Sequence, residues 1–151
     1  MAIALVPLFA FLESCVGIGL FVSGAFLLII SITLYESGAA IYEIASLAAI
    51  GAFLGDHAGF YLGRWLGHTF FFNLNSGRYE NRIKKAINLA QKHGAWGIFI
   101  GRFVPAVRSL LPATLGISEF QRAKFTLCDF VACIVWAVAL AAIVLTVNPL
   151  L

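Results

Sequence analysis

Two arginines, Arg102 and Arg108, lie in an apolar part of the chain, where a charge is costly. They flank Pro105 in the run GRFVPAVR, residues 101–108. An arginine at bilayer depth costs roughly 2.5–3.5 kcal/mol on insertion scales, so such residues usually line functional cavities. The planar guanidinium group binds phosphate or carboxylate through two parallel hydrogen bonds. The two arginines therefore predict a site for an anionic group beside a broken helix.

Two carboxylates, Glu13 and Asp56, are the acids that can serve such a site. Glu13 lies just before a long apolar stretch without charges, and a carboxylate held near hydrocarbon can bind and release a proton near neutral pH. Asp56 shares roughly one helix face with Arg64, two turns later. We expect both acids to act in proton coupling. The alternative is structural, with the acids pairing with the arginines or contacting a neighbouring helix.

The composition shows what surrounds these few charges. Of the 151 residues, 62% are hydrophobic and 11% are charged, against about 25% charged in an average globular domain. The mean hydropathy is +0.97. A soluble domain of this size cannot cover so much apolar surface. The composition therefore predicts an all-α integral membrane protein, and it excludes a disordered chain, a disulfide scaffold and a nucleic-acid-binding domain as the main interpretation.

Apolar stretches divide the chain into the elements that must position the charges. They are Cys15–Leu34, Ile44–Leu66, Ala95–Ile117 and Phe125–Val147. The first and last are long enough to cross a hydrocarbon core of ~30 Å. The third contains two prolines and has basic residues on both sides. Because basic flanks stay in the cytoplasm, we expect this stretch to enter the membrane and return as a re-entrant hairpin.

The Lys and Arg residues are unevenly distributed. None occurs in the first 63 residues, and five of them lie within residues 78–92. The positive-inside rule places this basic loop in the cytoplasm, where it can contact anionic lipid headgroups. Within Asn73–His93, apolar residues recur at i, i+4 and i+7, which indicates a short amphipathic helix at the membrane surface. An ordinary solvated connecting helix is the alternative.

Motifs for enzymatic or metal chemistry are missing from the sequence. There is no HExxH pair, and neither an intramembrane serine protease motif nor a lipid phosphatase motif occurs. The cysteines Cys15, Cys128 and Cys133 lie in apolar runs without metal-ligand spacing, so we expect inert buried thiols. The three histidines are scattered. We therefore predict no enzyme, no metal and no cofactor.

Glycine recurs at every fourth position from Gly51 to Gly67. Each step of four residues advances about 40° around a helix, so these five glycines form a slanting ribbon. A ribbon of small residues lets the backbone of another helix approach closely. We therefore expect a closely packed helix along this face.

Together these motifs resemble the DedA family of bacterial inner-membrane proteins, which is related to the eukaryotic VTT-domain proteins. The matching segments are FLES at 11–14, GD at 55–56 with Tyr61, GR at 63–64 and Gly67, GRFVPAVR at 101–108 with Pro112 and Gly116, and Phe125 followed by Trp136. The resemblance implies a helical bundle in the bacterial inner membrane, with two re-entrant hairpins that face each other.

The resemblance also implies an activity, the transport of lipid carriers such as undecaprenyl phosphate, coupled to an ion gradient. On this basis Glu13 would serve in proton coupling, while Arg102 and Arg108 would bind the lipid phosphate. Membrane lipids, either polyprenyl phosphate or phospholipid, would be the partners. Assembly into a homo-oligomer stays open, and no nucleic acid is expected.

The chain departs from the family pattern at several positions. Ala25 stands where the family has a second acid, and Asp129 and Ala132 stand where it has asparagine and glycine. We expect a single domain over residues 1–151 that lacks the last helix of the family. These departures support a second hypothesis, a degenerate membrane module that transports nothing and uses its glycine ribbon to assemble with a partner.

Overall fold

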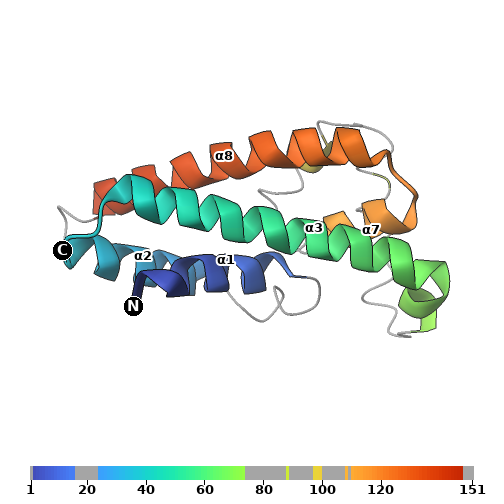
Figure 1. Ribbon diagram of the computed structural model, residues 1–151, viewed down its shortest axis with the longest axis horizontal. Helices are drawn as coiled ribbons and strands as arrows, with labels where there is room; N and C mark the ends of the chain where they lie inside the picture. The colour runs from blue at the N-terminus through green and yellow to red at the C-terminus, as the bar shows by residue number, and fades with distance from the viewer. Residues whose placement is uncertain are drawn as a thin grey trace.

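The computed structural model describes residues 2–15, 24–73, 88, 97–99, 108 and 110–147. Within them the helices are η1 (Ala2–Ala4), α1 (Leu5–Ser14), α2 (Gly24–Glu36), α3 (Ile41–Asn73), α7 (Leu111–Ile117) and α8 (Arg122–Val147). All regular elements of this part of the chain are helical, which confirms the all-α class. Figure 1 shows α3 in the middle, with α8 on one side, α1 and α2 on the other, and α7 along its C-terminal half.

Helix α8 is the only described helix that is both long and apolar enough to cross a membrane. Its 26 residues contain the predicted stretch Phe125–Val147. The helices α1 and α2 are apolar but have only 10 and 13 residues, whereas a crossing helix needs about 20. Figure 1 shows these two short helices running in opposite directions beneath α3.

The prediction of one spanning stretch over Cys15–Leu34 is wrong at its start. Helix α1 ends at Ser14, and Cys15 is extended, with φ −70° and ψ 136°. The helix that contains Leu34 is described from Gly24 to Glu36, while residues 16–23 lie outside the described residues. Hydropathy alone does not detect an extended residue such as Cys15, because an apolar residue contributes the same value in either conformation.

Helix α3 is longer than its apolar stretch. It follows a turn in which Gly38 has a φ of +95° and Ala39 N–H donates to Leu34 O over 3.0 Å, the pattern that ends many helices. The helix then runs for 33 residues to Asn73. Asn73 therefore belongs to α3 and does not begin the polar segment, since a helix can continue into polar sequence when its own backbone bonds are satisfied.

The glycine ribbon is the reason that α3 packs so closely against its neighbours. A Cβ at Gly51 would overlap the backbone of Pro7, and one at Gly55 would lie 2.7 Å from Phe11 O, both in α1. Farther along, a Cβ at Gly63 would overlap the backbone of Ala113 in α7. These contacts confirm the predicted close packing at Gly51, Gly55 and Gly63.

The partners of this ribbon are helices of the same chain. Gly51 and Gly55 are covered by α1, and Gly63 by α7, so these three positions are not open to another chain. The hypothesis of a degenerate assembly module used the ribbon as its contact surface. That hypothesis now needs a different contact surface. The observed packing of α1 and α7 on α3 instead brings elements of one chain together.

Two other predictions fall mainly outside the described residues. The amphipathic helix within Asn73–His93 is represented, beyond α3, by Asn88 alone, which is helical and exposed. The stretch Ala95–Ile117 is represented by residues 97–99, 108 and 110–117. The surface helix and the re-entrant hairpin in the third stretch therefore stay predictions.

Candidate functional site

Glu13 and Arg108, which are 95 residues apart in the sequence, form a buried ion pair. Arg108 Nη1 donates to Glu13 Oε1 over 2.5 Å, and the side chains are only 11% and 7% exposed. Arg108 Nη2 also donates to Ser14 Oγ over 3.4 Å. The last two residues of α1 therefore hold the guanidinium group. A predicted acid and a predicted base of the site meet in the structure.

The start of α2 lies against the same carboxylate. A Cβ added to Gly24 would be 2.9 Å from Glu13 Oε1. The lack of a side chain at Gly24 therefore leaves the space that the carboxylate occupies. A helix N-terminus carries a partial positive charge. Both the Arg108 guanidinium and the first turn of α2 therefore favour a negative charge at this position.

Trp136 of α8 lies against the Arg108 guanidinium. The guanidinium carbon lies 4.6 Å from the centroid of the Trp136 ring, within the range of a cation–π contact. In the sequence, only the family resemblance marks Trp136. Its contact with an arginine depends on how α8 packs, which spacing along the chain does not reveal.

Asp56 and Asp129 complete the charged site. Both residues are 1% exposed, Asp56 on α3 and Asp129 on α8. They line a cavity of about 10 Å³ together with Arg108, Ile98, Leu111, Pro112 and Phe125. That volume is about what the centre of one water molecule needs. From the sequence we expect of Asp129 only a polar contact with a neighbouring helix, and the structure places it beside Asp56 and Arg108, two of the predicted site residues.

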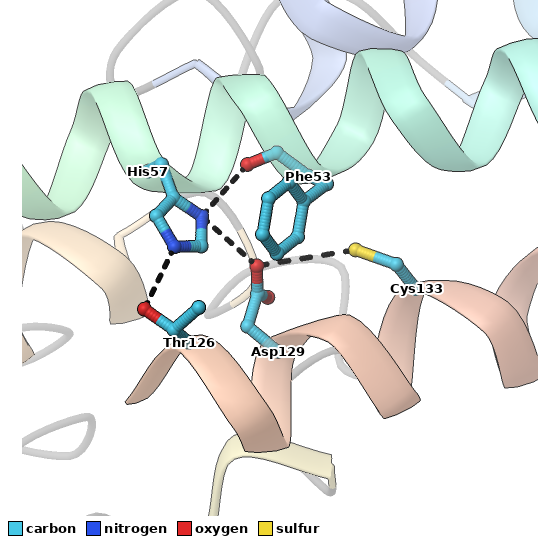
Figure 2. A network of polar contacts seen from close by, with 5 residues as sticks. All are labelled: Phe53, His57, Thr126, Asp129 and Cys133. Atoms are coloured by element: carbon cyan, nitrogen blue, oxygen red, sulfur yellow. Dashed lines mark hydrogen bonds and ion pairs between the residues drawn. The ribbon is translucent and has the colours of Figure 1, made fainter. Parts of the chain in front are cut away.

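Figure 2 shows a second group of polar contacts, centred on His57 and Asp129. His57 Nδ1 lies 3.5 Å from Asp129 Oδ2 and 3.0 Å from Phe53 O. His57 Nε2 lies 3.1 Å from Thr126 Oγ1. Sequence reasoning missed His57 as a site residue, because a single histidine has no spacing that marks it. Only the packing of α3 on α8 reveals its partner.

Three of the described residues bring metal-ligating atoms together. Asp56, Asp129 and Cys133 each have such an atom within 4.8 Å of the others. The Cys133 Sγ–Asp129 Oδ2 distance of 3.9 Å fits a thiol donating a hydrogen bond. Arg108 lines the cavity with both aspartates. We therefore interpret Cys133 as a hydrogen-bond donor to Asp129, with Asp56 beside them in the charged site.

The remaining arginines are placed differently. Arg102 lies outside the described residues, so its part in an anion site stays a prediction. Arg64 shares α3 with Asp56, and its Nη1 donates to Phe120 O over 3.3 Å, in the connection between α7 and α8. Among the described residues, Arg108 is the arginine that lines the cavity.

Comparison with known proteins shows relatives over most of the chain. Inner membrane protein YqjA of Escherichia coli K12 is 32% identical over 135 residues, which are 88% of this chain and 61% of YqjA. Inner membrane protein YabI of the same strain is 32% identical over 141 residues, 90% of this chain and 53% of YabI. The uncharacterized membrane protein ML0287 of Mycobacterium leprae is 30% identical over 97 residues, 64% of this chain and 44% of that protein.

The chain thus spans about three fifths of the length of YqjA. No solved structure matches it. The family model of the VTT domain matches residues 20–145, a range that contains Asp56, Arg108 and Asp129. This match and the two inner-membrane relatives confirm the resemblance found in the motifs. The chain belongs to the VTT-domain family, and within it to the DedA group of inner-membrane proteins.

Proposed function

We propose that this protein transports anionic lipid carriers, undecaprenyl phosphate or a phospholipid, across the bacterial inner membrane in a proton-coupled cycle. The observation that carries the proposal is the buried Arg108, held by Glu13 and Ser14 and stacked on Trp136. An oriented guanidinium group suits a phosphate, which accepts two parallel hydrogen bonds. The family relationship to inner-membrane proteins supports the location.

The Glu13 carboxylate and the lipid phosphate compete for Arg108, and this competition couples phosphate binding to the protonation of Glu13. Glu13 Oε1 uses the Arg108 Nη1 donor that a phosphate oxygen would need. A proton on Glu13 removes the charge that strengthens this bond, and Arg108 then becomes free to bind phosphate. By linkage, phosphate bound at Arg108 favours protonated Glu13 to the same extent. Asp56 lines the same cavity as Arg108 and acts as the second acid in this proposal.

The membrane arrangement in this proposal follows the sequence prediction. The short antiparallel helices α1 and α2 form one re-entrant hairpin, and the stretch Ala95–Ile117 forms the other. The supporting observations are that α1 and α2 are too short to cross and that the C-terminal end of α1 contacts Arg108. Arg102 would supply a second guanidinium group, and the loop 78–92 would lie in the cytoplasm.

The proposal is tested with the full chain in proteoliposomes. A fluorescent polyprenyl phosphate is loaded, and dithionite added outside bleaches only the outer leaflet, so the bleaching of inner-leaflet label measures transport. We expect the parent protein to move the phosphate lipid, faster under a pH gradient, and to leave the matching uncharged polyprenol in place. Arg102→Ala and Arg108→Ala should each slow transport at least about tenfold, since each removes a charge-assisted contact worth about 1.5–3 kcal/mol.

Lys124→Ala is the matched control, because Lys124 is a basic residue of α8 with an exposed side chain. It should transport at the parental rate. Arginine variants that move the lipid as fast as the parent would contradict the proposal, and so would equal transport of the polyprenol.

Gly24→Ala should disturb the site without destabilising the fold. Its new Cβ would lie 2.9 Å from Glu13 Oε1, and the carboxylate must move away from Arg108 to make room. The obstacle is the far end of a flexible side chain and not backbone, so the fold can accommodate the methyl group. We therefore expect a several-fold slower transport at an unchanged melting temperature. The control Thr33→Ala, on the exposed side of α2, should change neither, and parental transport by Gly24→Ala would contradict this account.

A further inference from the structure

We infer that His57, between Thr126 and Asp129, is a proton relay that connects the outer surface of the α3–α8 pair with the Glu13–Arg108 site. This inference rests on the proposed function, because it names the route by which that site exchanges its proton. Neither residue of the His57–Asp129 pair is needed for binding phosphate at Arg108. The proposed binding of phosphate and proton at the Glu13–Arg108 site does not use the contacts of His57.

The relay runs from an exposed group to a buried one. Thr126 is exposed, the His57 side chain is 16% exposed, and the Asp129 side chain is 2% exposed. The two nitrogen atoms of the His57 ring face in different directions, Nε2 towards Thr126 and Nδ1 towards Asp129 (Figure 2). A ring with one nitrogen atom on each side is the arrangement that passes a proton through histidine.

The buried end of the relay opens into the charged site. Asp129 lines the cavity that also contains Asp56 and Arg108, and Arg108 donates to Glu13. The cavity has about the volume that one water molecule needs. A proton on Asp129 is therefore one small cavity away from Asp56, and Arg108 lies between that cavity and Glu13.

The transfer balances with a hydronium ion as the proton source. Neutral His57 carries its hydrogen on Nδ1, where Phe53 O accepts it, and Nε2 accepts from the Thr126 hydroxyl. The Thr126 hydroxyl gives its proton to Nε2 and takes one from a hydronium ion, which becomes water, and the imidazolium then gives its Nδ1 proton to Asp129 Oδ2. One N–H bond breaks as one O–H bond forms, which leaves neutral His57 and a neutral Asp129 acid. Exchange with water restores the first tautomer, as the N–H bond at Nε2 breaks and one forms at Nδ1.

The surrounding charges favour this step. The charged and titratable groups of the described elements around the relay are Asp129, Cys133 and Arg122 on α8, Asp56, Tyr61 and Arg64 on α3, Glu13 on α1, and Arg108. The carboxylate of Asp129 stabilises a transient imidazolium directly. Arg122 and Arg64 face other groups, since Arg122 lies over the Tyr61 ring and Arg64 donates to Phe120 O. Arg108 lines the cavity on the far side of Asp129 and donates to Glu13.

A pH-jump experiment tests the relay separately from transport. Trp136 stacks on Arg108, so its fluorescence should change when Glu13 is protonated and Arg108 is released. Replacing Trp65 and Trp96 by phenylalanine leaves Trp136 as the only tryptophan of the chain. In this background we expect His57→Gln to slow the fluorescence change at least about tenfold at an unchanged amplitude, because glutamine keeps hydrogen bonds but transfers no proton.

Two controls complete the experiment. Ser46→Ala, at an exposed position of α3, should keep the parental rate, and Glu13→Gln should remove the amplitude. An equal rate in His57→Gln, or a signal that survives Glu13→Gln, overturns the relay. If His57→Gln slows the fluorescence response while the parent chain moves no lipid in proteoliposomes, the relay is supported and the proposed function is rejected.

Discussion

Arg108→Ala is expected to destabilise the protein and abolish lipid transport, and adding Glu13→Gln should restore most of the stability but none of the transport. The side chains of Arg108 and Glu13 are 11% and 7% exposed. Removing one partner of a buried ion pair leaves the other charge uncompensated, at a cost of about 3–5 kcal/mol. Glutamine has the shape of glutamate without the charge, so the double variant contains no orphaned ion.

Stability is measured by thermal unfolding in detergent and transport by the dithionite assay, both on the full chain. The double variant separates the two interpretations of the pair that the sequence left open. If Glu13 and Arg108 only stabilise the fold, the double variant is stable and also transports at the parental rate. If they bind proton and phosphate, it is stable and inactive. A double variant as unstable as Arg108→Ala would contradict the ion-pair account altogether.

Much of this site could be predicted from the sequence because its members are conspicuous. Glu13, Asp56 and Arg108 are charges in apolar surroundings, and the cost of burying a charge is a property of the residue and its neighbours in the chain. Glu13 and Arg108 do form a pair.

Asp129 and His57 could not be found in the same way. Their contact depends on the register between α3 and α8. The glycines of α3 help determine how that helix packs, but they do not mark His57 as a contact residue. A histidine within an apolar run is consistent with many environments. The contact with Asp129 becomes visible only when two long helices are placed side by side.

The prediction of the helix boundaries was wrong for a related reason. Hydropathy joined Cys15 to Leu34, although the backbone is extended at Cys15. That break matters for the site, since it ends α1 at Ser14 and so places both Glu13 and Ser14 next to Arg108. The apolar composition of a segment indicates that it lies in an apolar environment. It contains little information on where a helix ends within that environment.

The second large effect is expected at the crossing of α3 and α7, where Gly63→Ala and Gly116→Ala should each lower the free energy of unfolding by about 1–3 kcal/mol. A Cβ at Gly63 would overlap the backbone of Ala113, and one at Gly116 would overlap Phe60 O. Both obstacles are backbone atoms, so no rotation of a side chain can relieve them. The helix α7 must move away, and with it Leu111 and Pro112, which line the cavity.

The same crossing makes a sharper prediction for the double variant. Once α7 has moved to accommodate one methyl group, the second methyl group meets less resistance, so Gly63→Ala/Gly116→Ala should lose less stability than the sum of the single losses. Such non-additivity is expected of residues that share one interface. Ala58→Val, at an exposed position of α3, is the control and should unfold like the parent. Strictly additive losses would mean that the two glycines do not share a crossing, and single variants as stable as the parent would mean that α3 and α7 do not approach this closely.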